Sequence, residues 1–251
     1  MVDRCCELVP YDGTPEQLQD LLTVYNRFTE GRTLMWQRYN DTCFQNKTVY
    51  IYYENGAPTG YISFSTEETF CINHYTNGLM TVHETAYITP KALRSILGFV
   101  RMFEGELENE EFTHLESCPE IELLIKHDTY TAYQRVLDIM ARVIHTEAFL
   151  KALQYPAQEG SFRLRVEDAL PSGRGSFQVD YGKGDAVVTR LDDSAATDIT
   201  LDMPAFSRLV YGYDGVSAKE AAYMNGVSIS GNADDFFRAF PKQHAGAFEH
   251  F

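Results

Sequence analysis

The side chains that could bind a metal or act as a nucleophile are scattered along the chain. The cysteines have irregular spacing and include no C-x-x-C pair; they are Cys5, Cys6, Cys43, Cys71 and Cys118. Zinc sites and disulfide frameworks need regular cysteine pairs, so we expect reduced and mostly buried thiols. His74, His83 and His114 have no cysteine or carboxylate partner at metal-ligand spacing. The sequence therefore predicts no metal site.

Other short signatures of catalysis or ion binding are weak or missing. Residues 180–185 (DYGKGD) have acidic ends like a calcium loop but lack its full ligand series, so we expect a hairpin turn. The sequence contains no G-x-S-x-G nucleophile elbow, no Walker loop and no glycine-rich dinucleotide loop. Any chemistry must therefore come from residues that the fold brings together.

The elements of the first part of the chain begin with two predicted helices. Thr14, Pro15 and Gln17 form a helix start, and apolar residues at helical spacing continue to Gly31. A second helix, which would carry Trp36 and Tyr39, is predicted over about residues 34–44.

Strands come next. Residues 48–53 and 60–64 are rich in β-branched and aromatic residues, and the Asn55-Gly56 pair between them favours a tight hairpin. Thr89-Pro90 starts another helix. The remaining predicted elements are strands at residues 69–73 and 80–88, a strand near 113–116, a helix over 119–126 and a strand near 138–144.

The last hundred residues have a different texture. After a predicted helix at 145–153, four strands joined by short turns are followed by three helices; the strands are 161–166, 175–181, 185–191 and 197–202, and the helices are 204–211, 217–225 and 233–240. A run of strands before a run of helices is typical of a separate α+β domain. We predict the fold class α+β with two domains, residues 1–150 and 151–251.

Four patches resemble one family. They are VYIYYENGAPTGYISF, MTVHETAYITPKALRSILGFV, LDIMARVIHTEAFLKAL and ITLDMPAFSRLVYGY. They resemble the later two-thirds of the Eis (enhanced intracellular survival) proteins, which are GNAT N-acetyltransferases. The resemblance implies a degenerate GNAT-like domain followed by a domain similar to sterol carrier protein. It also implies that acetyl-CoA is bound by an amino-terminal domain that this chain lacks.

The donor-binding motif of GNAT proteins is missing from the sequence. That motif, Q/R-x-x-G-x-G/A, aims backbone N–H groups at the coenzyme diphosphate. The nearest match, residues 243–248 (QHAGAF), ends in Phe and lies in the tail. We therefore predict that this chain binds no cofactor itself, while acetyl-CoA serves the full-length family.

The resemblance points to the carboxylate of the C-terminal residue, Phe251, as the base that deprotonates the amine. A free α-carboxyl has a pKa of about 3.5, so it needs burial or a relaying water to act as a base. It would equally well bind the substrate ammonium, and a frayed tail is the other interpretation.

His250 stands where the family often has an acidic residue, and we predict a substrate-binding role for it. A histidine can shuttle protons but lacks that negative charge, so polycationic aminoglycosides are not expected as substrates.

Arg142 lies in an R-x-x-D-like patch in which His145 replaces the aspartate that is more common in the family. The role of that aspartate is an open question for this chain.

Composition limits the possible partners and location. The chain has 21 Lys and Arg against 36 Asp and Glu, a net charge of −15. Nucleic acids and anionic membranes need clustered basic residues, so we expect neither as a partner. No signal peptide and no run of roughly 18 apolar residues are visible, so we predict a cytoplasmic location.

Three functional hypotheses follow. The first is the acceptor side of an Eis-like N-acetyltransferase, inactive without its donor domain, which acts on a small amine and forms a homo-oligomer; the family is hexameric. The second is a non-catalytic carrier that holds a lipid or acyl ligand among the apolar strands after residue 160. The third is a structural partner of a separately encoded acetyltransferase.

Overall fold

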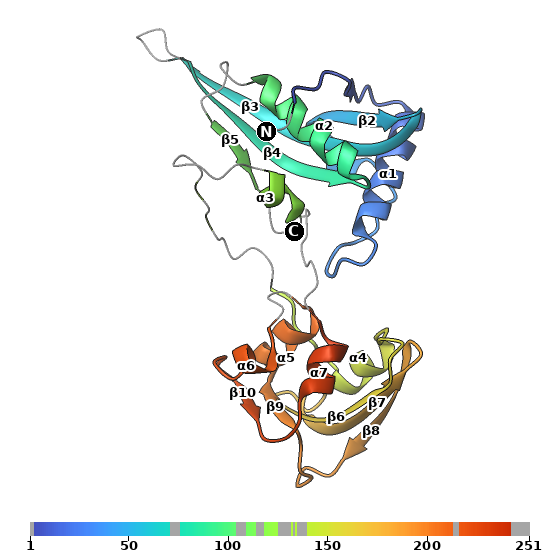
Figure 1. The fold of residues 1–251 in the computed structure, drawn as a ribbon, viewed down its shortest axis with the longest axis vertical. Coiled ribbons are helices and arrows are strands. Elements are labelled where there is room, and N and C mark those ends of the chain that lie inside the picture. The colour runs from blue at the N-terminus through green and yellow to red at the C-terminus, as the bar shows by residue number, and fades with distance from the viewer. Residues whose placement is uncertain are drawn as a thin grey trace. The chain divides into compact units, whose positions relative to one another are not determined.

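The computed structural model describes residues 3–70, 76–103, 109–113, 118–124, 132, 134, 140–212 and 216–241. Its contacts divide the described residues into two compact units: unit 1 holds those up to residue 134, and unit 2 holds those from residue 140 onward. Each unit has its own sheet (Figure 1), and each has its own hydrophobic core.

The sheet of unit 1 has the strand order β1-β2-β3-β4-β5. Its strands are β1 (Val9–Pro10), β2 (Thr48–Glu54), β3 (Ala57–Phe70), β4 (Thr76–Tyr87) and β5 (Asn109–Phe112). Neighbouring strands are antiparallel except β4 and β5, which are parallel. A parallel pair needs a crossover, and the helix between these two strands supplies it.

Helices cover both faces of this sheet. They are α1 (Pro15–Thr29), α2 (Pro90–Val100) and α3 (Glu120–Leu124), with short 3-10 turns at Thr42–Phe44 and Arg101–Phe103. A Cβ on Gly60 would lie only 3.0–3.1 Å from side chains of α2, so this glycine allows α2 to approach β3 closely. The next residue, Tyr61, points to the other face, where its hydroxyl lies 3.4 Å from Arg38, an arginine stacked on Tyr25 of α1.

Local signals predicted several of these elements correctly. Both cap-and-proline starts are confirmed: α1 begins at Pro15 and α2 at Pro90. The predicted hairpin is confirmed as well, with Asn55 and Gly56 at φ of 52° and 81°. β3 is longer than predicted and extends to Phe70, so the start of the strand expected at 69–73 belongs to it; residues 71–73 lie outside the described residues.

Two other segments depart from the prediction. β5 ends at Phe112, so the strand predicted near 113–116 begins earlier than expected, and residues 114–116 lie outside the described residues. The strand predicted near 138–144 is wrong over residues 140–144. Only Val143 is buried there, and its backbone N–H donates to the hydroxyl of Ser207 instead of to a neighbouring strand.

The helix predicted over residues 34–44 is wrong. Leu34 has a φ of 65°, which no right-handed helix accommodates. The side-chain amide of Asn26 bonds both the N–H and the C=O of Arg38, at 3.0 and 3.1 Å, and so replaces helical partners. Trp36 and Tyr39 are therefore exposed, at 61% and 80%. Tertiary contacts override the local pattern in this segment.

The sheet of unit 2 has the order β10-β9-β6-β7-β8. Its strands are β6 (Gly160–Glu167), β7 (Gly175–Gly182), β8 (Asp185–Leu191), β9 (Ile199–Asp202) and β10 (Val227–Ile229). Only β6 and β9 run parallel. Four of these strands were predicted; β10, only three residues long, was not. The 180–185 segment forms the predicted hairpin turn between β7 and β8.

The helices of unit 2 are α4 (Thr146–Ala152), α5 (Met203–Val210), α6 (Ala218–Ala221) and α7 (Asp234–Ala239). α6 is shorter than the predicted 217–225, because turn-type bonds from Tyr223 and Met224 replace its helical bonds. Aromatic rings fill the core under α7: Phe236 lies 5.4 Å from Phe162 and 4.9 Å from Phe240, centroid to centroid.

Candidate functional site

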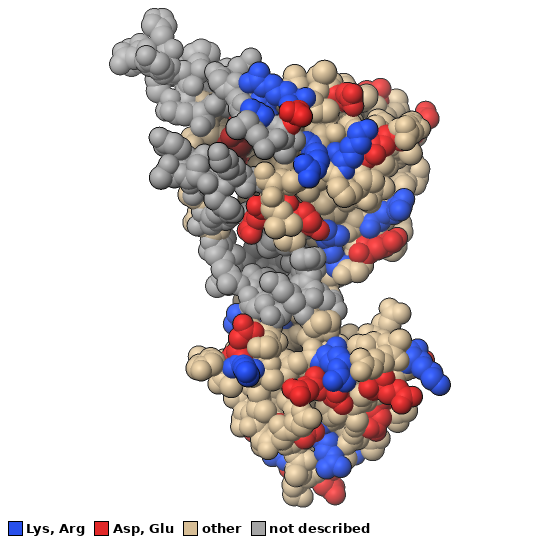
Figure 2. All heavy atoms as spheres, viewed as in Figure 1, with Lys and Arg blue, Asp and Glu red and all other residues tan. Residues whose placement is uncertain are grey.

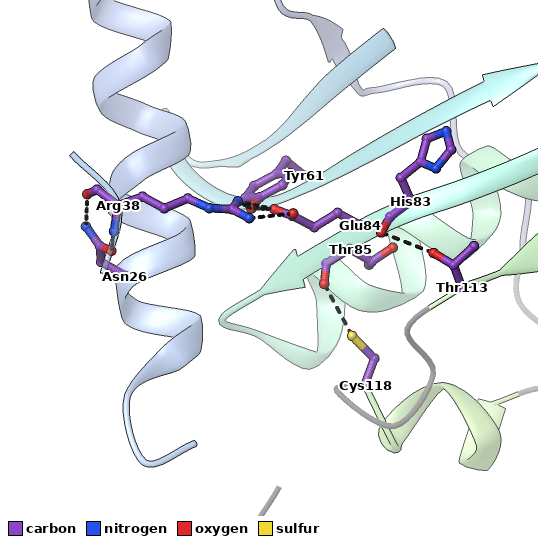
Figure 3. Close-up of polar contacts among 8 residues, drawn as sticks. All are labelled: Asn26, Arg38, Tyr61, His83, Glu84, Thr85, Thr113 and Cys118. Atoms are coloured by element: carbon purple, nitrogen blue, oxygen red, sulfur yellow. Dashed lines mark hydrogen bonds and ion pairs between the residues drawn. The ribbon is translucent and has the colours of Figure 1, made fainter. Parts of the chain in front are cut away.

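A buried ion pair lies in the core of unit 1. Nη1 and Nη2 of Arg38 donate to the two carboxylate oxygens of Glu84 at 2.5 and 2.8 Å, and the Tyr61 hydroxyl donates to the same carboxylate. The side chains of Arg38 and Glu84 are only 4% and 2% exposed. The guanidinium also stacks 3.8 Å from the centroid of the Tyr25 ring. Figure 3 shows Arg38 reaching across to Glu84 on β4.

The ionisation states of this cluster favour a structural role. Burial alone would lower the pKa of Arg38, but the hydrogen bonds and charge of Glu84 raise it above its usual value, so the guanidinium stays charged. Burial, together with the charge of Glu84, raises the pKa of Tyr61 well above its usual value, so Tyr61 stays protonated. A carboxylate that accepts three hydrogen bonds is not free to remove a proton from a substrate. We conclude that the cluster anchors the fold.

Sequence reasoning missed this cluster, although one signal could have found it. Met80, Val82, Glu84 and Ala86 alternate along β4 and are all buried. A carboxylate on an otherwise apolar strand face needs a buried cation. That signal predicts a partner for Glu84 but cannot name Arg38, which lies 46 residues away.

The edge of β4 next to β5 is occupied by bonds within unit 1. Thr113 donates from its backbone and its hydroxyl to the carbonyl of Val82, both at 3.1 Å, and its hydroxyl lies 3.4 Å from the carbonyl of His83. The thiol of Cys118 donates to the carbonyl of Thr85 at 3.2 Å (Figure 3). Burial raises the pKa of Cys118, so it is a buried thiol and not a reactive thiolate.

The first turn of α2 has few free N–H groups. The hydroxyl of Thr89 accepts from the N–H of Ala92 at 3.0 Å, and Pro90, at the first helical position, has no N–H. That leaves at most the N–H of Lys91 in the first three positions. The Thr89 hydroxyl also donates to Glu54, which fixes the cap in place. This turn is therefore not the open nest of N–H groups that a diphosphate needs.

The predicted site residues at the C-terminus lie outside the described residues. This applies to Phe251 and His250, and to the weak motif match at 243–248. His83, one of the solitary histidines, lies with its Nε2 2.8 Å from the hydroxyl of Ser65. In the part of the chain that the structure describes, no three His, Cys, Asp or Glu side chains are placed to hold a metal ion.

Arg142 and His145 have separate partners in unit 2. Nη2 of Arg142 lies 2.6 and 2.7 Å from the two carboxylate oxygens of Asp168, whose side chain is 4% exposed. Burial alone would raise the pKa of Asp168, but Arg142 and the backbone N–H of Leu170 hold it below its usual value. Nδ1 of His145 accepts from the N–H of Ala148 at 3.2 Å, so this side chain caps α4 as an aspartate would.

The surfaces of both units carry mixed charge. On the face drawn in Figure 2, acidic and basic side chains of the described residues are interspersed in each unit. Within those residues, no helix has both the length and the apolar character needed to cross a membrane.

The two halves of the chain match two family models. Residues 31–143 match an acetyltransferase (GNAT) domain, and residues 146–245 match a sterol carrier protein domain. No curated protein matches the sequence.

Solved structures of low sequence identity share the fold. A GCN5-related N-acetyltransferase from Anabaena variabilis is 15% identical with a TM-score of 0.69, and the match covers 99% of this chain and 64% of that one. A probable N-acyltransferase from Enterococcus faecalis is 16% identical with a TM-score of 0.70, covering 100% and 63%. Eis1 from Mycobacterium abscessus is 16% identical with a TM-score of 0.61, covering 99% and 64%.

These matches confirm the predicted fold class: a GNAT acyl-CoA N-acyltransferase fold followed by a C-terminal domain like sterol carrier protein. This chain spans less than two thirds of the length of each of the three relatives.

We expect the Arg38–Glu84 pair to dominate the stability of unit 1. Glu84→Leu should lower the free energy of unfolding by about 3–5 kcal/mol, because it leaves the Arg38 charge buried without a partner. The double variant Arg38→Met/Glu84→Leu should lose much less. Urea unfolding followed by the fluorescence of Trp36, the only tryptophan, measures both. Equal losses in the single and double variants would contradict this account.

The Arg142–Asp168 pair should make unit 2 sensitive to acid. Because the folded-state pKa of Asp168 is lowered, its contribution is present above the unfolded-state pKa of about 3.9 and is lost as the pH falls through the folded value. Asp168→Asn should cost about 1 kcal/mol at pH 7, and progressively less as the pH falls below the unfolded-state pKa. Urea unfolding at several pH values tests this. The exposed pair of Glu147 and Lys151 supplies the control variant, Glu147→Gln, which should have a much smaller effect.

Proposed function

We propose that this chain is the acceptor-side and C-terminal portion of an Eis-like N-acetyltransferase, which transfers an acetyl group from acetyl-CoA to a small amine. In this proposal a domain other than unit 1 and unit 2 binds acetyl-CoA, and the two units alone are inactive. The fold supports acyl transfer to an amine as the general class of activity. The greater length of the relatives is in keeping with a further domain.

One observation carries the donor-free part of the proposal: the first turn of α2 is closed. GNAT proteins hold the coenzyme diphosphate with backbone N–H groups at the start of a helix that follows a strand. Here Pro90 removes one of these N–H groups and Thr89 takes another. The carbonyls of Val82 and Thr85 at the edge of β4 are also bonded, by Thr113 and Cys118, so a pantetheine arm would compete with existing bonds.

The acceptor chemistry is assigned to the C-terminus. The amine must lose a proton before its nitrogen attacks the thioester carbonyl; the C–S bond then breaks and CoA leaves as the thiol. We assign proton removal to the carboxylate of Phe251 and a substrate-binding role to His250. The donor domain must then lie against this end of the chain. A homo-oligomer, with the hexamer of the family as its form, belongs to the same proposal.

A lipid carrier is the alternative function, and the core of unit 2 gives it no support. The apolar side chains of β6 and β7 face a core filled by aromatic rings. Phe162, Phe177, Phe206 and Phe236 are each at most 1% exposed. The ring of Phe162 meets those of Phe236 and Phe240 edge to face, with centroids 5.4 and 6.1 Å apart, and this is the packing of a closed core. This packing favours a scaffold role for unit 2.

The chain alone should neither bind acetyl-CoA nor release CoA from it when amines are added. Isothermal titration calorimetry and a thiol-release assay measure the two. Micromolar one-to-one binding would contradict the proposal.

When the chain is joined to a domain that binds acetyl-CoA, thiol release should depend on the amine. Deletion of Phe251 should then lower kcat by about 10²-fold or more and leave the KM for acetyl-CoA unchanged.

The scaffold role of unit 2 predicts that no lipid accompanies the protein. Native mass spectrometry of the chain, before and after incubation with a lipid extract, should show only the mass of the polypeptide or its oligomer. A fatty acid or phospholipid retained at one per chain would favour the carrier function.

A further inference from the structure

Unit 1 contains a cavity of about 610 Å³ that neither the ion pair nor the acetyl-transfer proposal uses. It lies among the C-terminal end of α1, the end of β4, the first turn of α2, and α3. This volume is within the range of ordinary ligand pockets. Its described lining has more positive than negative charge: the charged side chains are Arg27, Arg32, Arg94, Glu30 and Glu120. A locally positive cavity is unexpected in a chain with a net charge of −15.

Arg32 is the least exposed of these cations, with a side chain 14% exposed. Its Nη1 donates to the carbonyl of Phe28 at 2.5 Å, and the guanidinium lies 3.8 Å from the centroid of the Phe28 ring. The opposite edge of the guanidinium, formed by Nε and Nη2, makes no hydrogen bond to the described residues. Nε is buried with no hydrogen-bond partner among the described residues, and Nη2 is 3.9 Å from Glu120, beyond hydrogen-bond distance.

Glu120 lies at that edge, with one carboxylate oxygen 3.9 Å from Nη2. Its other oxygen accepts from the hydroxyl of Tyr87 at 2.5 Å, and its side chain is 43% exposed, so it can move aside toward solvent. Burial and the hydrogen bond to Glu120 raise the pKa of Tyr87, which therefore remains a donor at neutral pH. Because Nε is itself buried, a carboxylate that takes the place of Glu120 reaches Nη2 first and pairs with both nitrogens once the side chains over Nε shift. Paired in this way, Nε and Nη2 form the two-pronged donor with which arginine binds carboxylates best.

Most of the remaining wall is apolar. Phe28, Tyr87 and Leu93 are at most 8% exposed, and Leu124 of α3 completes the lining on that side. The rings of Phe28 and Tyr87 are in edge contact, with centroids 5.2 Å apart. A ligand that fits must therefore join one anionic group to an apolar body. A diphosphate fits poorly, because the first turn of α2 at the border of the cavity is closed.

We propose that this cavity is a binding site for a small monocarboxylate with an apolar, aromatic-sized body. Arg32 binds the carboxylate through its Nε and Nη2 edge, and Arg94 and Arg27 at the exposed rim add attraction. The proposal depends only on side chains of unit 1, so it stands or falls independently of the acetyl-transfer function.

Calorimetry with the full chain and 4-phenylbutanoate tests the site, with the neutral 4-phenylbutanamide as the matched probe. The acid should bind at millimolar or better affinity and the amide at least about tenfold more weakly, a difference of about 1.4 kcal/mol. Arg32→Gln should reduce binding of the acid about tenfold or more. The exposed variant Arg94→Gln should reduce it severalfold, and this variant keeps the test valid if Arg32→Gln is unstable.

Lys91→Gln is the control, because it removes an exposed positive charge from the same turn of α2 outside the cavity lining. It should change the affinity less than twofold. Three results would each overturn the proposal. They are equal binding of the acid and the amide, equal effects of Lys91→Gln and Arg94→Gln on the affinity, and no binding of the acid at about 5 mM, a concentration at which a ligand of millimolar affinity occupies most of its sites.

Discussion

The charge of Glu84 is the constraint on which unit 1 depends. A carboxylate on the buried face of β4 is tolerable only when a cation and further donors meet it there. Arg38 meets it because the segment after α1 gives up helical structure and binds the side chain of Asn26 instead. The ion pair thus fixes the irregular segment after α1, the helix α1 and the strand β4 relative to one another.

Elements with local causes could be predicted from sequence, and elements with distant causes could not. The starts of α1 and α2 and the hairpin at Asn55-Gly56 depend on residues within four positions of one another. The local sequence was therefore enough to predict them. The segment at 34–44 failed because its conformation depends on Asn26 and Glu84. β10, at three residues, is too short to produce a periodic signal and exists only through its pairing with β9.

The same distinction applies to the candidate sites. The resemblance supplied Phe251 and His250, and their assignment remains a prediction. The cavity beside Arg32 was not predicted, because its charged residues come from α1, α2, α3 and the segment after α1, and no spacing rule connects them. The closed first turn of α2 was readable from the sequence, since Thr89-Pro90 both starts the helix and removes an N–H group.

Both units have a core of buried apolar side chains, and they differ in the pockets that lie beside that core. Aromatic rings occupy the interior of unit 2. The hollow of about 590 Å³ beside the start of β6 and the end of β7 lies at the surface, and its lining includes Glu159, Asp180, Lys183 and Asp235. In unit 1 the N–H groups that a GNAT protein offers to a diphosphate are largely used up, while guanidinium groups face a cavity at the same end of the sheet. Backbone nests suit the dense charge of a diphosphate, whereas a guanidinium edge against an aromatic wall suits a single planar carboxylate. A shared fold therefore need not retain a shared ligand, because selectivity depends on which groups remain free at the end of the sheet.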